Sequence, residues 1–472
     1  MKNVLNGGVC IGKNSILSQI DSTMTYIGVI SSYNSVLYHS VLVPSLLTTW
    51  NESCVVLDYD SNVFNLTAGC RQKRLNNKIL KLDKNSFAYN PLSEVRLMSY
   101  YENDDLRDVF APLFDYLLSD NNRFSDIMFL LDNAVELLQV VAKHIIYKEF
   151  LQNPNFIYED KSKIPVSDVT LLDVMSFFDG DVKSKIKSIL SENLIEYGIS
   201  DEIREFVKDN IIHYDTPLRD DVELVNEKGQ NPLVINRLDY FIKIKTNIFD
   251  DVIKTIKKAF ERATKDIPDL EKSIFNAKSR FRMYDIVNGE KPVSVYLCYN
   301  DNDLQNMKPI YKAFMSQFLV KVTDTEDMSN KYKCLMALNR LEYFGYIARF
   351  NTVQGYAHGY GIKFLLGLNS LDYIRDFYGN ENNVIINLQS VIYDYTIDYK
   401  SKKQLKERKF DVIDIPDDEP YRIAYLAKSY EPVLVTNNFD EKHRDFNTYN
   451  ELSEIELDAE DVKTEDITEK GN

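Results

Sequence analysis

The chain has 472 residues, of which 44% are hydrophobic and 27% charged, a composition typical of a globular protein with room for two or three domains. Its formal net charge of −16 argues against a protein that coats DNA or an anionic membrane by itself. The sequence shows no secretory leader, no apolar run of about 18 residues and no metal-ligand spacing among its cysteines, so we expect a soluble protein of the cytoplasm.

The first motif lies at residues 7–14, Gly-Gly-Val-Cys-Ile-Gly-Lys-Asn, which is one residue short of the phosphate-loop pattern GxxxxGK[ST]. Such a loop wraps phosphates in backbone N–H groups, its Lys contacts phosphate oxygens, and its last hydroxyl holds magnesium. Asn14 has no hydroxyl, and few residues precede Gly7 to form the strand that should lead into the loop. A glycine turn leaving an edge strand is the alternative interpretation.

A second segment has the order of elements that a phosphate loop requires. Residues 26–30 are a short apolar strand, residues 31–38 a small polar loop, and residues 41–47 an apolar helix. The loop itself contains neither Gly nor Lys. Further apolar strands follow at 53–57, ending in Asp58, and at 78–82, and such continuous runs separated by helices indicate a parallel sheet covered on both faces.

Helical periodicity then replaces strands. Apolar residues recur every three or four positions in 106–118, 127–147, 169–178 and 186–197, which predicts a helical insertion, and residues 214–232 read as a connecting loop. From about residue 285 the α/β pattern returns, with strands at 293–298, 333–338 and 362–368 and with helices at 304–319, after 338 through 350, and at 370–377. We predict four parts: residues 1–101 and 233–440 forming one sheet domain, an all-α insertion at 102–232, and an acidic, disordered tail at 441–472.

Several ordered blocks carry a resemblance to a known family. They are GGVCIG at 7–12, LVPSLLTTW at 42–50, VVLD at 55–58, LTAGCR at 66–71, YNPLSEVR at 89–96, PVSVYL at 292–297, GYGIK at 359–363 and YGN at 378–380. Together these blocks resemble the TraG/TraD-like coupling proteins of type IV secretion and conjugation, which are hexameric inner-membrane ATPases with a RecA-like motor and a helical insertion. The resemblance implies an α/β fold, a RecA-like P-loop NTPase-type sheet flanked by helices, with the inserted all-α domain.

The same resemblance implies partners and a location. The partners would be type IV secretion or conjugation components, in a homo- or hetero-hexamer with a TraG-like paralogue. The resemblance begins close to Met1, so we expect the family's N-terminal membrane helices to be missing, and the protein to reach the inner membrane only peripherally, through its partners.

The departures from the family pattern decide the expected activity. Counted back from Pro44, the family's phosphate loop falls on residues 32–38, which places Leu37 at the position of its lysine. Asn339 and Arg340 replace the acid pair that binds magnesium and activates water. The degenerate nucleotide-binding positions are Ser32, Asn34, Val36, Leu37, Tyr38, Asn339, Arg340 and Asn369, the last standing where the family has a γ-phosphate-sensing Gln.

Phosphoryl transfer depends on cations placed around the triphosphate. We therefore predict a pseudo-ATPase with no catalytic residue, no metal and no cofactor, acting as a structural or regulatory component of a DNA or protein transfer apparatus. One alternative is an active ATPase that binds ATP and Mg through Gly7, Gly12 and Lys13, with Asp58 as the magnesium acid. Another is a decayed remnant without a selected function.

Two charged features leave further partners open. Basic runs at 71–84, 254–265 and 400–409 could contact DNA, although in an acidic chain such runs are more often solvated faces. The acidic residues at 451–469 could dock on a basic partner, against the alternative of a solvated, disordered tail.

Overall fold

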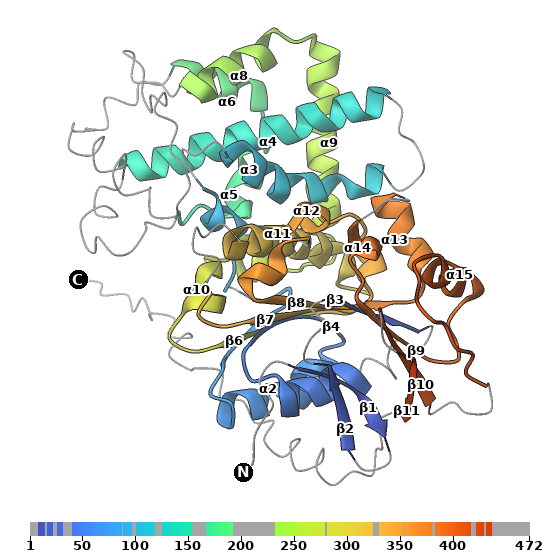
Figure 1. Cartoon of the computed structure of the whole chain (residues 1–472). Coiled ribbons are helices and arrows are strands. Elements are labelled where there is room, and N and C mark those ends of the chain that lie inside the picture. Colours follow the sequence, from blue (N-terminus) through green and yellow to red (C-terminus); the bar gives the residue numbers. More distant parts are fainter. Residues whose placement is uncertain are drawn as a thin grey trace, which may run out of the picture.

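The computed structural model describes residues 8–14, 17–21, 26–31, 40–86, 88–96, 101–118, 125–152, 167–191, 232–278, 281–323, 330–353, 355–379, 383–416, 422–428 and 431–436. A broad sheet occupies the lower half of the molecule, helices cover both of its faces, and a helical lobe stands above it (Figure 1). The predicted tail at 441–472 lies outside the described residues.

The strands form one sheet in the order β2-β1-β11-β10-β9-β3-β8-β7-β4-β6-β5. All neighbours from β9 to β5 pair in parallel, whereas β9/β10, β10/β11, β11/β1 and β1/β2 pair antiparallel. The strands are β1 (Val9–Asn14), β2 (Leu17–Asp21), β3 (Tyr26–Ile30), β4 (Ser53–Tyr59), β5 (Lys78–Leu82), β6 (Val293–Tyr299), β7 (Cys334–Leu338), β8 (Ile362–Leu368), β9 (Ser390–Tyr393), β10 (Arg422–Ala427) and β11 (Val433–Thr436).

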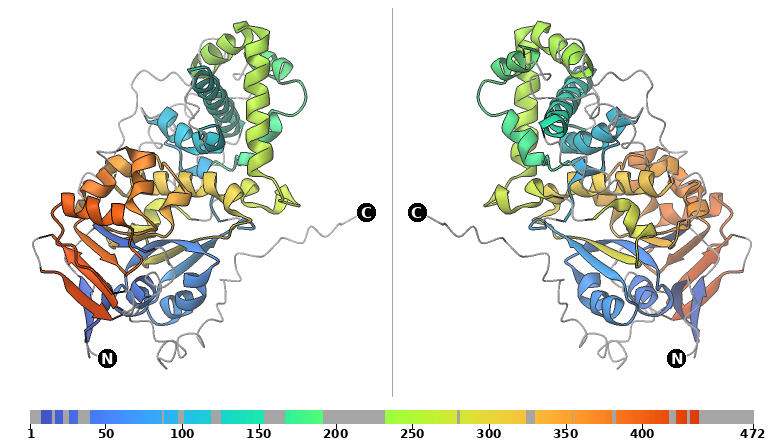
Figure 2. Two further views of the ribbon diagram at one scale, coloured as in Figure 1. Left: turned by 90° about the vertical axis from the view of Figure 1, so that its right-hand side faces the viewer. Right: turned by 90° about the vertical axis from the view of Figure 1, so that its left-hand side faces the viewer.

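Alternation along the parallel strands builds a separate core on each face, because successive side chains point to opposite sides of a sheet. On β4, Val55 and Leu57 face one core and Cys54 and Val56 face the other, and all four are buried. The lower core also takes α2 (Asn62–Lys73), residues 40–44 and the π-helical turn η1 (Ser45–Thr49). Figure 2 shows α2 and the helical lobe on opposite faces of the sheet.

The upper face carries the remaining helices of the sheet domain. These are α10 (Met283–Asn288), α11 (Leu304–Thr323), α12 (Phe350–Val353), α13 (Leu371–Tyr378), α14 (Asn383–Ile386) and α15 (Tyr399–Glu407), with the short turns η2 (Pro91–Glu94), η6 (Leu270–Lys272), η7 (Ile274–Asn276), η8 (Leu341–Tyr343) and η9 (Ala357–Tyr360). In α11, a buried helix, 15 residues from Asn306 to Val322 are buried, so it forms the centre of the upper core.

The helical lobe is organised around one long helix. α4 (Ser125–Gln152) packs against α3 (Glu102–Phe110), α8 (Pro232–Lys243) and α9 (Thr246–Ala263), and the lobe also holds η3 (Ala111–Leu117), α5 (Leu171–Phe177) and α6 (Val182–Ser191). The structure therefore extends the helical part to Ala263, past the predicted boundary at residue 232. No helix in the described ranges is long and apolar enough to cross a bilayer.

Ion pairs and a hydrogen bond join the helical lobe to α11 and to Arg349. The Asp115 carboxylate accepts from Lys312 Nζ at 2.6 Å, and the Asp108 carboxylate accepts from Ser316 Oγ at 2.8 Å and from Arg349 Nε at 3.1 Å. Asp108 and Lys312 are almost fully buried. The joint is therefore specified by charge-assisted hydrogen bonds as well as by apolar packing.

One predicted helix is not formed. The segment after β7 contains only the single turn η8 before α12, rather than a helix through Phe350. Arg340, Gly345 and Arg349 all have positive φ, at 52°, 68° and 63°, and three left-handed residues interrupt any right-handed helix there.

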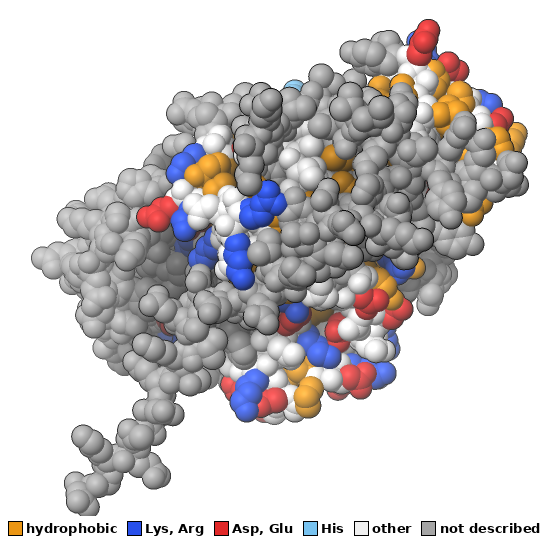
Figure 3. Space-filling model, turned by 90° about the horizontal axis from the view of Figure 1, so that it is seen from below, with side chains coloured by type: hydrophobic (Ala, Val, Ile, Leu, Met, Phe, Trp, Pro, Cys, Tyr) orange, Lys and Arg blue, Asp and Glu red, His pale blue; other side chains and the backbone are white. Residues whose placement is uncertain are grey.

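The described part of the face on the sheet side carries charged side chains of both signs. Figure 3 shows acidic and basic side chains both reaching the surface on the described part of the face seen from below, without either sign covering it. This distribution gives no continuous basic field on the described part of that face, in keeping with the net charge of −16.

Candidate functional site

The carboxyl ends of β3, β8, β7 and β4 lie side by side at one edge of the sheet. The registers pair Ile30 with Leu368, Leu338 with Leu366, and Leu57 with Leu338. The residues that follow these strand ends therefore meet, as they do in open α/β sheets that bind ligands at this edge. This edge brings together three predicted positions, Asn339, Arg340 and Asn369, with Asp58.

Asn339 lies at the end of β7 and is buried. A Cβ atom added to Gly367 on β8 would come within 2.8 Å of Asn339 Oδ1, so the amide packs directly against the glycine backbone. Asn339 Oδ1 accepts no hydrogen bond from any residue described in the structure. This position, where the sequence resemblance implies that other members have a magnesium-binding carboxylate, thus carries a neutral amide oxygen.

Arg340 has left-handed backbone geometry, with φ at 52°, which turns its side chain across the end of β4. Its Cζ atom lies 3.9 Å from the centroid of the Tyr59 ring and 5.5 Å from that of Tyr343. These are cation–π distances, so the two rings hold the guanidinium in place. A fixed positive charge at this edge opposes a divalent cation there.

Glu342 is a residue that the sequence reasoning missed. It lies two positions after Arg340 in η8 and is only 7% exposed. Its two carboxylate oxygens have no regular hydrogen bond within the described part of the chain. Burial raises the pKa of Glu342 to about 7, and the backbone N–H groups of Glu342 and Asn369 and the Arg340 guanidinium offset only part of that effect.

Glu342→Gln is expected to flatten part of the pH dependence of stability. A raised pKa means that the folded protein binds the proton of Glu342 more tightly than the unfolded chain does. The contribution of Glu342 to the free energy of unfolding is therefore largest below its ordinary pKa of 4.5, and it is lost as the pH rises to about 7. Urea unfolding at pH 4.5 and pH 8 should show little difference between variant and parent at pH 4.5, and a gain of up to about 3 kcal/mol for the variant at pH 8. An equal effect at both pH values would contradict this account of the buried carboxyl.

The Asp58 carboxylate stabilises the start of the helix that follows it. The carboxylate is fully buried and accepts from the backbone N–H of Val63 at 3.0 Å and of Phe64 at 2.8 Å, at the amino end of α2. These N–H groups have no acceptor within the helix, so Asp58 caps it. Burial nevertheless raises the pKa of Asp58 to about 7, against the lowering effect of those bonds and of Lys81. Both oxygens already serve α2 rather than a metal.

The N-terminal glycine motif forms a strand in the structure. Gly12 and Lys13 lie within β1, paired with Gln19 and Ser18 of β2, and nothing is described of their side chains or of Gly7. At the start of the motif, Thr49 Oγ1 donates to Gly8 O at 2.7 Å. The extended backbone differs from the curved loop that the active-ATPase alternative requires. It also differs from a glycine turn leaving an edge strand, because β1 is paired with β2 on one side and with β11 on the other.

The family loop positions Ser32, Asn34, Val36, Leu37 and Tyr38 lie outside the described residues. Along the chain they fall between β3 and the helical residues 40–44. Ser31, the last described residue before them, donates through Oγ to Asp394 Oδ2 at 2.7 Å. Asp394 follows β9, a strand that the sequence analysis did not predict, so this buried carboxylate was missed with it.

Among the described residues, no three His, Cys, Asp or Glu side chains are grouped so that they could hold a metal ion. All five cysteines are buried and free. These strand ends thus combine a buried amide, a guanidinium held between two aromatic rings, and a buried carboxyl with a raised pKa.

Comparison with known proteins identifies the family of the chain. Residues 4–409 match the family described as type IV secretory system conjugative DNA transfer. Two conjugal transfer proteins TraG of Escherichia coli are 23% and 22% identical over 361 and 363 residues, which is 74% of this chain and 49% of each relative. The chain therefore spans about half the length of the curated relatives that it matches.

Solved structures of the plasmid coupling protein TrwB have a similar fold. The TrwB complex with the ATP analogue ADPNP superposes with a TM-score of 0.53 at 10% identity, covering 88% of this chain and 86% of that one. The TrwB complex with ADP and Mg²⁺ gives a TM-score of 0.51 at 10% identity, covering 88% and 85%. At this identity the likeness concerns the fold alone, and it confirms the RecA-like sheet flanked by helices that the sequence predicted.

Proposed function

Because the chain belongs to the type IV secretory system conjugative DNA transfer family, we propose that it is a coupling-protein-like pseudo-ATPase, a structural or regulatory component of a DNA or protein transfer apparatus. The observation that carries the proposal is the pair at the end of β7. Asn339 supplies no charge for magnesium, and the Arg340 guanidinium is clamped over Tyr59 at the same edge. Both replace groups on which phosphoryl transfer depends.

The active-ATPase alternative has less support from the geometry. It requires Lys13 in a phosphate loop and Asp58 on magnesium, whereas Lys13 lies in β1 and both Asp58 oxygens accept from α2. The remnant alternative predicts a decayed core. Against it stand the continuous buried cores on both sheet faces and the hydrogen-bonded side chains of the family blocks.

We propose that its partners are type IV secretion or conjugation components, in a homo- or hetero-hexamer with a TraG-like paralogue. In such an assembly, a subunit with an inactive pocket would help to hold the other subunits in position without hydrolysing ATP itself. The protein would then be cytoplasmic and held at the inner membrane through its partners.

The test is nucleotide binding with a matched variant. Titration of the purified chain with a fluorescent ATP analogue and Mg²⁺ is expected to show no saturable binding below about 1 mM, which corresponds to about 4 kcal/mol of binding free energy or less. Mg-ATP should leave the unfolding temperature unchanged, because a ligand that does not bind cannot stabilise. The control is a coupling protein with an intact phosphate loop, titrated under the same conditions.

Two results would overturn the proposal. ATP turnover above background that Lys13→Ala abolishes would establish the first loop as active. Saturable binding that Arg340→Ala weakens would show that the family edge still holds nucleotide.

A further inference from the structure

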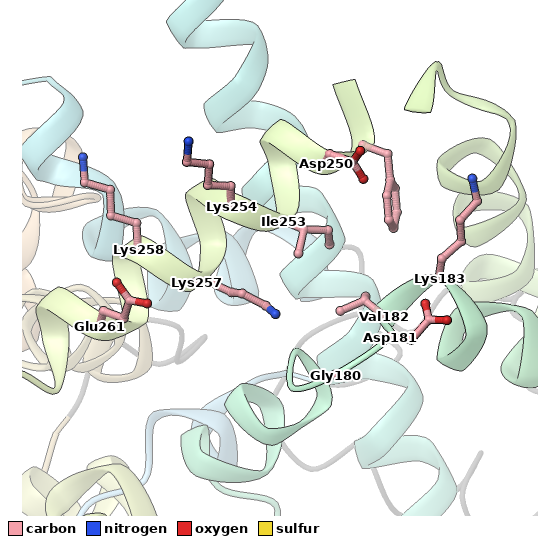
Figure 4. A pocket seen from close by; sticks show the side chains of 11 residues that line it. Gly180, Asp181, Val182, Lys183, Asp250, Ile253, Lys254, Lys257, Lys258 and Glu261 are labelled. Carbon is pink, nitrogen blue, oxygen red and sulfur yellow. The ribbon is translucent and has the colours of Figure 1, made fainter. Parts of the chain in front are cut away.

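The helical lobe contains a hollow that is separate from the strand ends carrying Asn339 and Arg340. It is a groove of about 690 Å³ between the turn that precedes α6 and one side of α9. Its apolar lining consists of Ile253 and the small exposed parts of the largely buried Val182 and Phe249, and Figure 4 shows the side chains of Val182 and Ile253 beside those of the charged residues. A groove of this size accommodates several side chains of a peptide.

Four lysines line the groove, Lys183 from α6 and Lys254, Lys257 and Lys258 from α9. Lys183 Nζ lies 5.8 Å from the Phe249 ring centroid, while Lys254 and Lys257 form no ion pair with any residue in the described ranges. In Figure 4 the amino group of Lys257 points toward the hollow between α9 and Val182. Uncompensated cations beside apolar surface indicate an occupant that is both acidic and apolar.

The acids in the groove do not neutralise these lysines. Asp181 accepts from Ser184 N at 3.1 Å and Ser184 Oγ at 2.7 Å, so it caps α6. Asp250 and Glu261 stand toward the two ends of the α9 segment (Figure 4). Acidic residues at both ends of the groove disfavour a nucleic acid, whose phosphate backbone would have to pass them. A short acidic peptide segment that lies between them fits the charges better.

We propose that the occupant is the chain's own acidic segment at residues 451–461, Glu-Leu-Ser-Glu-Ile-Glu-Leu-Asp-Ala-Glu-Asp. Its acids would face the lysines, and Leu452, Ile455 and Leu457 would meet Val182, Phe249 and Ile253. The last described residue is Thr436, and an extended chain spans about 3.3–3.6 Å per residue, so the stretch to Leu452 reaches on the order of 50 Å. The docked segment would occupy the groove and exclude acidic partners from it.

Carbodiimide cross-linking of the full-length chain tests this directly, because it joins only a carboxylate and an amine in contact. Mass spectrometry is expected to find links from Lys254 and Lys257 to Glu454 and Glu456, at low ionic strength and in the monomeric fraction. The variant Glu454→Gln/Glu456→Gln/Asp458→Asn should lower hydrogen-exchange protection of residues 246–261 at least threefold. These substitutions lie outside the described fold, so they leave the sheet and lobe intact. Asp461→Asn alone is the matched control at the end of the segment and should change protection less.

Three outcomes would overturn the proposal. Links that form only between isotope-labelled and unlabelled copies would assign the groove to a second chain. Links from the segment to Lys400 or Lys406 instead would place it elsewhere. Salt-sensitive binding of a single-stranded oligonucleotide that Lys254→Glu/Lys257→Glu abolishes, with no internal link, would make nucleic acid the occupant.

Discussion

Replacing Arg71 by alanine is expected to destabilise the protein by more than about 5 kcal/mol, enough to unfold most domains of this kind. Arg71 is fully buried, and its guanidinium donates to Ser294 Oγ at 2.6 Å, Leu46 O at 2.9 Å and Trp50 O at 2.6 Å, and also to Asn77 Oδ1 and Glu52 O. Each hydrogen bond to a charged group contributes about 1.5–3 kcal/mol, and alanine removes five such bonds, most of them to buried acceptors.

Arg71 joins α2, η1 and β6 through those acceptors, so its loss affects the whole lower face of the sheet. Arg71→Lys keeps the charge but supplies fewer donors in a different geometry, and should cost about 3 kcal/mol. Arg107→Ala is the control, since Arg107 pairs with Asp132 on the surface, with both side chains about half exposed, and should cost less than about 1 kcal/mol. Urea unfolding followed by circular dichroism measures all three, and equal losses for Arg71→Ala and Arg107→Ala would contradict the assignment.

Asp105→Ala is expected to cost about 4 kcal/mol, because it removes the carboxylate that accepts three hydrogen bonds from the buried Arg96. Arg96 donates through Nε at 2.8 Å and Nη2 at 2.6 Å to the Asp105 carboxylate, and its backbone N–H donates to the same group at 3.0 Å. The two side chains are 6% and 5% exposed. The pair links the YNPLSEVR block to α3, at the base of the helical lobe.

The Asp105 prediction is checked by a double-mutant cycle with Arg96→Met. The double variant should be less destabilised than the sum of the two single variants, since removing both charges leaves none buried alone. Asp132→Ala, at the exposed pair with Arg107, is the matched control and should change stability little. A loss below about 1 kcal/mol for Asp105→Ala would refute the role of this pair.

The parallel strands were the part of the fold that residue patterns predicted best. β3, β5 and β8 begin and end at the predicted residues. For β3 and β8 the reason is that a strand buried on both faces is a continuous apolar run between polar turns. β9, β10 and β11 were not predicted. They are four to six residues long, and β10 and β11 belong to the antiparallel side of the sheet, where partners distant in sequence decide pairing.

The sequence predicted which strand ends carry Asn339, Arg340 and Asn369, but not how their side chains lie, and their role stays a prediction. The family blocks located Asn339, Arg340 and Asn369, and the strand registers bring them to one edge. Nothing in the sequence predicted that Arg340 turns to lie over Tyr59, because this depends on its left-handed φ of 52°. Glu342 was missed because an acid after an apolar run ordinarily reaches solvent, and only tertiary packing buries it.

The role of Asp58 illustrates the limit of reading chemistry from position. A carboxylate at the end of a buried strand suits magnesium, but the same position also faces the amino end of the following helix. Val63 and Phe64 supply two N–H groups there, and the structure uses the carboxylate for them. The sequence alone is compatible with both roles of Asp58, as a magnesium ligand and as a helix cap.

The joint between the lobe and α11 has a mechanical consequence. Because Asp108 bonds to Ser316 and Asp115 to Lys312, and Asp108 also bonds to Arg349 ahead of α12, a tilt of the lobe must either carry α11 with it or break several hydrogen bonds together. α11 in turn lies against the sheet at β6, so a force that tilts the lobe would also act on the sheet.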